Sequence, residues 1–213
     1  MPDGYAFTDL TFPQDGSVLE GITIRVGRNE SVALFGPNGG GKSSVMRVIA
    51  GTVPRARPLA DVAYLPQTPY LFRGTVGSNL GLGLDARESE RARELATEMD
   101  VGALLNEPSG AISVGETQRI CLARTLASTA PLLLLDEPLA PISAAGRLKI
   151  VDIIKGCTAD RGLLWATHNL DTVRAFADTL IILDRGAILQ EGPVSQVIES
   201  PANEQVASIL GLT

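Results

Sequence analysis

Short apolar runs and amphipathic segments alternate along most of the chain. Residues 31–35 and 131–135 are apolar on both faces, which is typical of buried strands in a parallel sheet. Residues 86–100, 115–129 and 143–155 instead carry apolar side chains at helical spacing, which predicts helices with one buried stripe. The alternation of the two patterns predicts an α/β fold built around a parallel sheet.

The pattern differs at the beginning of the chain. Residues 6–12 and 18–26 favour strands, and residues 13–17 between them are rich in turn formers. In the second of these strands, Ile22 and Ile24 alternate with polar residues, as in a half-buried antiparallel strand. We therefore expect an antiparallel β patch before the main sheet.

A stretch of about residues 68–128 separates two of the predicted strands. Residues 68–79 are expected to form a loop, and the helices at 86–100 and 115–129 follow it. We predict one domain, residues 1–213, with this stretch as a small helical insertion. The remaining predicted elements are strands at 61–65, 162–167, 180–183 and 187–190, and helices at 170–177, 193–200 and 202–210.

Composition limits the classes of protein that fit. Of the 213 residues, 45% are hydrophobic and 20% are charged, which suits one sizeable core. No apolar run approaches the ~18 residues of a membrane span, and the start lacks a basic region followed by an apolar one, so we expect a cytosolic protein without a secretory signal. A net charge of −6 argues against binding to nucleic acid or anionic lipid, so any membrane role goes through a protein partner. The two cysteines lack metal-ligand spacing and are expected to be buried free thiols.

A glycine-rich segment lies between the apolar run at 31–35 and a predicted helix. Its glycines let the backbone wrap around a polyphosphate, and the helix adds its positive N-terminal end. Lys42 supplies a cation, and Ser43 offers a hydroxyl to Mg²⁺. Because strand and helix flank the segment, we predict a site for ATP and Mg²⁺ rather than a chance glycine-rich turn. The predicted binding residues are Gly36, Pro37, Asn38, Gly39, Gly40, Gly41, Lys42, Ser43 and Ser44.

Polar side chains that suit the same site follow three other predicted strands. Asp136 ends a buried strand and is expected to hold Mg²⁺, and Glu137 can orient or deprotonate water. The alternative is an acidic strand end that only caps the next element. His168 is the only histidine; a lone histidine is more often structural, but its place after a buried strand favours a γ-phosphate contact. Gln67 either ligates Mg²⁺ or is an ordinary loop residue.

Together these residues resemble the ATP-binding subunit of ABC transporters over essentially the whole chain. Residues 112–119 look like the family signature, which separates this family from other P-loop ATPases. The resemblance implies a P-loop NTPase core with an antiparallel β patch and a helical insertion. The other matching features are the Walker A loop from Gly36 to Ser43, the Walker B strand ending at Asp136, the catalytic glutamate at Glu137, the Q-loop glutamine at Gln67 and the switch histidine at His168.

The resemblance also implies partners. In the family two subunits pack head to tail, so a homodimer is implied in which Ser113 and Gly115 of one chain complete the ATP site of the other. Separate membrane permease subunits would dock near residues 69–80 and hold the chain at the cytoplasmic face of the inner (plasma) membrane, with a substrate-binding protein involved indirectly. Residues 192–211 resemble the tail of small importers of the oxyanion and metal-ion type, and the lack of a fused membrane segment favours import.

Three positions depart from the family pattern. Val114 stands where the signature has a glycine, and a β-branched residue is strained there if the backbone needs a positive φ. Ser143 stands where the loop after the Walker B strand ends in an aspartate. Gln14 stands where an aromatic side chain stacks on adenine, which leaves Phe12 as the candidate for that contact.

The leading hypothesis is therefore a Mg²⁺-dependent ATPase that energises solute import through separate permease subunits. The alternative is a weakly hydrolysing regulatory nucleotide-binding subunit that pairs with another ATPase, which the departures at Val114 and Ser143 favour. A soluble ABC protein of DNA repair or translation fits less well because the chain is acidic and carries an apparent coupling segment. A small-molecule kinase would lack the signature.

Overall fold

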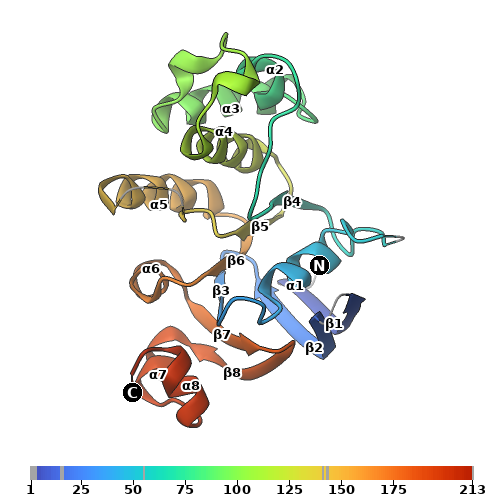
Figure 1. Cartoon of the computed structure of the whole chain (residues 1–213), viewed down its shortest axis with the longest axis vertical. Coiled ribbons are helices and arrows are strands. Elements are labelled where there is room, and N and C mark those ends of the chain that lie inside the picture. The colour runs from blue at the N-terminus through green and yellow to red at the C-terminus, as the bar shows by residue number, and fades with distance from the viewer. Residues whose placement is uncertain (1–3, 15–16, 55, 141, 143, 213) are drawn as a thin grey trace.

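The computed structural model describes residues 4–14, 17–54, 56–140, 142 and 144–212. Six of its strands form the central sheet: β3 (Ser31–Phe35), β4 (Val62–Leu65), β5 (Leu132–Asp136), β6 (Gly162–Thr167), β7 (Thr179–Asp184) and β8 (Ala187–Pro193). Their order is β4-β5-β6-β3-β7-β8 (Figure 1). The first five run parallel, and β8 pairs with β7 in the antiparallel direction. The sheet confirms the predicted α/β fold.

The antiparallel β patch predicted at the start of the chain is also confirmed. Strands β1 (Gly4–Gln14) and β2 (Ser17–Gly27) pair with each other and form a separate two-stranded sheet. Ile24 and Val26 are fully buried and pack in one cluster with apolar residues of α1 (Lys42–Ile49). Figure 1 shows this pair of strands beside α1. The patch thus supports one side of the loop that leads into α1.

The three helices between β4 and β5 in the chain form a separate layer at the top of Figure 1. Helix α3 begins with a capping box, in which Asp85 and Glu88 satisfy each other's backbone N–H groups. These helices all lie within the stretch predicted as a helical insertion. They are α2 (Val76–Leu80), α3 (Ala86–Glu98) and α4 (Val114–Ala127), with short 3-10 turns at Gly102–Leu104 and Ser109–Ala111.

The prediction that residues 68–79 form only a loop is wrong at its end, where α2 begins. The Thr75 side chain accepts a hydrogen bond from the N–H of Ser78 and caps this helix. Val76 and Leu80 are buried against the rest of the insertion. Two buried apolar residues and one cap stabilise this short helix. Its five residues are too few to show a helical pattern of apolar positions in the sequence.

Four more helices follow β5 in the chain, each where the sequence predicts one. Apolar residues of all four helices pack in one cluster with Trp165 of β6. Trp165 is fully buried, and its ring N–H donates to the Ser31 hydroxyl at 3.0 Å. Among the described residues, no helix combines the length and apolarity needed to cross a membrane. These helices are α5 (Ala144–Thr158), α6 (Leu170–Phe176), α7 (Val194–Glu199) and α8 (Glu204–Ile209).

Side-chain alternation along β5 decides where its terminal carboxylate points. Leu133 and Leu135 pack in the cluster that contains the helices of the insertion, whereas Leu132 and Leu134 pack in the cluster that contains α1. Successive side chains of a strand face opposite sides of the sheet, so Asp136 faces the same side as Leu132 and Leu134. The strand therefore delivers a carboxylate to the beginning of α1.

Candidate nucleotide-binding site

The loop between β3 and α1 is shaped by glycines where no side chain fits. A Cβ at Gly36 would lie 1.9 Å from the carbonyl oxygen of Leu183 on β7. Gly41, the N-cap of α1, has φ +109° and makes no side-chain capping bond. The first N–H groups of α1 therefore have no side-chain partner at the cap and carry the positive end of the helix dipole, which suits a phosphate group.

Lys42 is the buried cation of this loop. Its Nζ donates to the carbonyl oxygens of Gly36 at 2.7 Å and Pro37 at 2.9 Å. Burial lowers the pKa of Lys42, and the negative charges of Glu137 and Asp136 oppose this shift. The loop thus holds the ammonium group in place, and this group is predicted to bind a phosphate of the nucleotide.

Asp136 is a buried carboxylate without a hydrogen-bond partner among the described residues. It is 1% exposed, and neither side-chain oxygen is bonded. Burial raises the pKa of Asp136. The Ser43 hydroxyl, the charges of Lys42 and Arg47 and the backbone N–H of Gln67 oppose the shift, although neither the hydroxyl nor this N–H reaches hydrogen-bonding geometry. A buried carboxylate with two free oxygens is costly unless a cation or a proton joins it.

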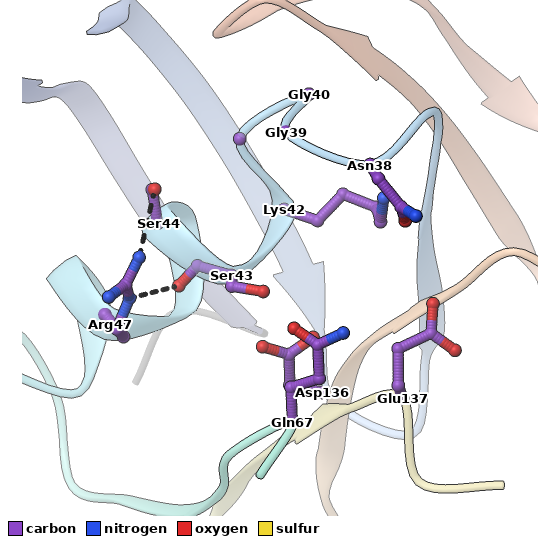
Figure 2. A pocket seen from close by; sticks show the side chains of 11 residues that line it. Asn38, Gly39, Gly40, Lys42, Ser43, Ser44, Arg47, Gln67, Asp136 and Glu137 are labelled. Atoms are coloured by element: carbon purple, nitrogen blue, oxygen red, sulfur yellow. Dashed lines mark hydrogen bonds between the residues drawn. The ribbon is translucent and has the colours of Figure 1, made fainter. Parts of the chain in front are cut away.

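The oxygen atoms around Asp136 fit Mg²⁺, which prefers oxygen ligands and is commonly held by one or two carboxylates together with phosphates. Figure 2 shows Asp136, Gln67 and Glu137 rising from strand ends toward the loop that carries Lys42 and Ser43. Within the described part of the chain, no group of three or more His, Cys, Asp or Glu residues could hold a metal by itself. The donor set thus suits a cation that arrives with a nucleotide better than one bound by protein side chains alone.

Glu137 lies next to Asp136 and is held in an unusual backbone conformation. Its φ is +49°, and its side chain is mostly buried. Nδ1 of His168 lies 2.9 Å from Oε1 of Glu137, and the ring N–H donates when the carboxylate is ionised. Burial raises the pKa of Glu137, and the hydrogen bond from His168 is the largest opposing effect. A carboxylate with a raised pKa beside a nucleotide pocket is suited to act as a general base.

Most of the predicted residues line one cavity of about 250 Å³. Gly36 and Pro37 are not among the lining residues, but their carbonyl oxygens accept the Lys42 hydrogen bonds. His168 does not line the cavity but reaches it through Glu137. The lining residues are Asn38, Gly39, Gly40, Gly41, Lys42, Ser43, Ser44, Arg47, Gln67, Asp136 and Glu137.

Arg47 is a lining residue that the sequence analysis missed. Its side chain donates to the Ser43 carbonyl at 3.3 Å and to the Ser44 hydroxyl at 3.5 Å (Figure 2). The signal in the sequence was its spacing, because a residue four positions after Ser43 on a helix lies on the same face. Arg47 adds a second positive charge to the cavity, beside the residues that are predicted to bind phosphate.

The predicted signature residues lie elsewhere, at the beginning of α4. Ser113 is the N-cap of this helix and forms a capping box with Glu116, and neither Ser113 nor Gly115 lines the cavity of its own chain. Val114 is the first residue of the helix, is 79% exposed and does not have a positive φ. A β-branched residue at this position would be strained only with a positive φ, so Val114 is not strained here.

Two predictions at the edges of the site fall on residues that the structure does not describe in full. Phe12 pairs with Leu19 in the β1–β2 ladder, but its side chain and that of Gln14 lie outside the described part. Ser143 lies outside the described residues altogether. The adenine contact and the departure at Ser143 stay predictions.

The glycine-rich loop, its lysine and the carboxylates at the end of β5, set in a sheet of parallel strands flanked by helices, define a P-loop nucleoside triphosphatase. Comparison with known proteins identifies the family. The family model described as "ABC transporter" matches residues 19–140, and the chain belongs to this family as an ATP-binding ATPase domain.

Similar proteins agree with this assignment. The molybdate/tungstate import ATP-binding protein of Thermococcus kodakarensis is 32% identical over 91% of this chain and 66% of that protein, so the chain spans just under two thirds of its length. The thiamine import ATP-binding protein of a Ruegeria species is 32% identical over 91% of this chain and 94% of that protein. An ATP-bound bacterial Atm1-family ABC exporter has a TM-score of 0.83 at 22% identity, over 97% of this chain and 41% of that one, and shares the fold.

Proposed function

We propose that the chain is the Mg²⁺-dependent ATPase of an import system and energises solute uptake through separate membrane permease subunits. Support for import comes from the names of two relatives, which are both import ATP-binding proteins, and the chain matches one of them over 94% of its length. Because an exporter has the same fold, the fold alone does not decide the direction of transport. In this role the chain works at the cytoplasmic face of the plasma membrane, bound to its permease rather than to lipid.

In the proposed reaction, the chain's own residues bind the triphosphate and direct water to it. Lys42 and the N–H groups at the start of α1 bind phosphate oxygens, and Ser43 and Asp136, with Gln67 beside them, would hold Mg²⁺. When bound, Mg²⁺ supplies positive charge that offsets the negative charge developing on the phosphates. Glu137 orients the attacking water and accepts its proton, while His168 fixes the Glu137 carboxylate.

One observation carries this proposal: Glu137 is buried, has a raised pKa, bonds to His168 at 2.9 Å and opens into the same cavity as Lys42 and Asp136. The test is phosphate release from Mg²⁺-ATP by the purified chain and by the Glu137→Gln variant, with binding of a fluorescent ATP analogue measured in parallel. We expect turnover to fall by roughly 10²–10⁴-fold while nucleotide binding is retained. Full turnover in the variant would contradict the role of Glu137.

We further propose that the chain acts as a homodimer. Ser113 and Gly115 lie at an exposed helix start and do not line the cavity of their own chain, so they are free to complete the site of a second copy. The second candidate function is a regulatory subunit that binds ATP but pairs with another ATPase. The observation that favours it is the exposed apolar side chain of Val114 at this helix start, where the family signature has a glycine.

A further inference from the structure

Gln118 is a buried polar residue of α4 that contacts the segment carrying Glu137. It is 2% exposed and is the fifth residue of the helix whose N-cap is Ser113. Its side-chain amide donates to the carbonyl oxygen of Pro138 at 3.3 Å and to that of Glu137 at 3.5 Å. The amide thus reaches from the helical insertion to the chain that leaves β5.

The backbone of Glu137 needs such contacts to keep its conformation. A φ of +49° is sparsely populated for a residue with a side chain and persists only when the surroundings fix it. The N–H of Glu137 donates to the carbonyl of Ala166 at 3.0 Å, and its carboxylate bonds to His168. The carbonyl oxygen of Glu137 accepts from the N–H of Ala140 at 3.3 Å and from the side-chain amide of Gln118 at 3.5 Å.

We propose that Gln118 is a positioning residue for the hydrolysis reaction, tying the helix that starts at Ser113 to the backbone of Glu137 in the same chain. The inference rests on the proposed role of Glu137. Five residues of helix span about 7.5 Å, so a shift at the beginning of α4 acts on Gln118 within a turn and a half. Bonds of 3.3–3.5 Å are longer than most N–H···O hydrogen bonds, so a small movement of α4 strengthens or breaks them.

The opposite end of α4 is anchored more firmly. The guanidinium of Arg161 donates to the carbonyl oxygens of Leu126, at 3.0 Å, and Ser128, and also to that of Cys157 at the end of α5. One half-buried side chain therefore joins the C-terminal ends of two helices, one in the insertion and one beside the sheet. Movement of α4 relative to the sheet is then expected to be largest toward its N-terminal half, where Gln118 lies.

The test compares Gln118→Met, which keeps a similar volume but cannot donate a hydrogen bond, with a matched control. Thr125→Val removes a buried hydroxyl from the same helix, and among the described residues this hydroxyl bonds only to the Cys121 carbonyl of that helix. We expect Gln118→Met to lower kcat by about three- to tenfold, the size of one or two lost hydrogen bonds. The affinity for a fluorescent ATP analogue and the KM should stay unchanged, and Thr125→Val should keep the wild-type kcat.

A second comparison separates positioning from a general loss of structure. In the Glu137→Gln background, Gln118→Met should cause no further loss, because the group that it positions is already gone. An additive loss there, or the same kcat for Gln118→Met as for Thr125→Val, would overturn the inference. If the methionine variant does not fold, Gln118→Leu serves instead, since the leucine side chain is apolar and also cannot donate. Full turnover of Glu137→Gln alone would refute the role of Glu137 itself, whereas an inactive Glu137→Gln beside a normal Gln118→Met would refute only the positioning role.

Discussion

Replacing Asp136 by asparagine should make the nucleotide-free protein more stable and its Mg²⁺-dependent nucleotide binding weaker. The carboxylate is 1% exposed and neither of its oxygens is bonded, so the folded protein bears the cost of a desolvated charge. Burial is the largest influence on the pKa of Asp136 and outweighs the opposing effects of Ser43 and Lys42. Loss of this charge should therefore stabilise the fold even though it also removes an attraction for Lys42.

The size of the effect follows from the cost of an unpaired buried polar group. That cost is about 1–3 kcal/mol or somewhat more for a charged group, and for a chain of this size 1 kcal/mol corresponds to roughly 2–4 °C in Tm, so we expect a rise of about 2–12 °C. The pKa of Asp136 is higher in the folded state than in the unfolded chain, so its ionised carboxylate destabilises the fold fully at pH values above the folded-state pKa. This destabilisation disappears as the pH falls toward about 3.9, the pKa of an aspartate in the unfolded chain. The difference between the two proteins should shrink in the same range.

The assay is thermal unfolding of both proteins in EDTA at neutral pH and at several lower pH values. The exposed Asp160→Asn serves as the control, since it removes the same charge without relieving a buried one. Binding of a fluorescent ATP analogue with and without Mg²⁺ shows whether the variant has lost the metal-dependent part of its affinity. An unchanged or lower Tm for Asp136→Asn would refute the conclusion that this carboxylate is buried without a partner.

Two further predictions concern the loop and the proposed base. Gly36→Ala should lower the free energy of unfolding, measured by urea denaturation, by about 2–5 kcal/mol, because the new Cβ would clash with the Leu183 carbonyl. The control is Gly39→Ala, whose Cβ meets nothing within 4 Å and which should lower it by only about 1 kcal/mol. Equal losses for the two variants would refute the clash. His168→Ala should lower turnover by roughly 10²-fold and move the acid limb of the pH profile of kcat/KM upward, because the hydrogen bond from His168 lowers the pKa of Glu137. An unchanged profile would contradict that bond.

Much of the fold could be predicted from the sequence because its strands are short, apolar on both faces and bounded by turn formers. The run before Asp136 is fully buried in β5, and the glycine-rich loop lies between β3 and α1 as its motif requires. Helix α2 could not be predicted, since its single turn is stabilised by burial of Val76 and Leu80 after folding. Tertiary burial of this kind leaves no periodic pattern in five residues.

The site was predictable to the extent that its residues follow strand ends. The sequence placed Gln67, Asp136 and Glu137 at the edge of one sheet, and the structure brings all three to one cavity. It could not reveal the positive φ of Glu137 or the contact from Gln118, because these depend on how the insertion packs against the end of β5.

The central claim is that this chain is a self-sufficient ATPase whose site is completed by a second copy. The most direct test is the mass of purified Glu137→Gln protein, measured by light scattering after size exclusion with and without Mg²⁺-ATP. We expect a shift from monomer to dimer when ATP is present, and we expect Ser113→Arg in the same background to prevent this shift. A protein that binds ATP and remains a monomer would contradict the homodimer and support the regulatory subunit that pairs with another ATPase.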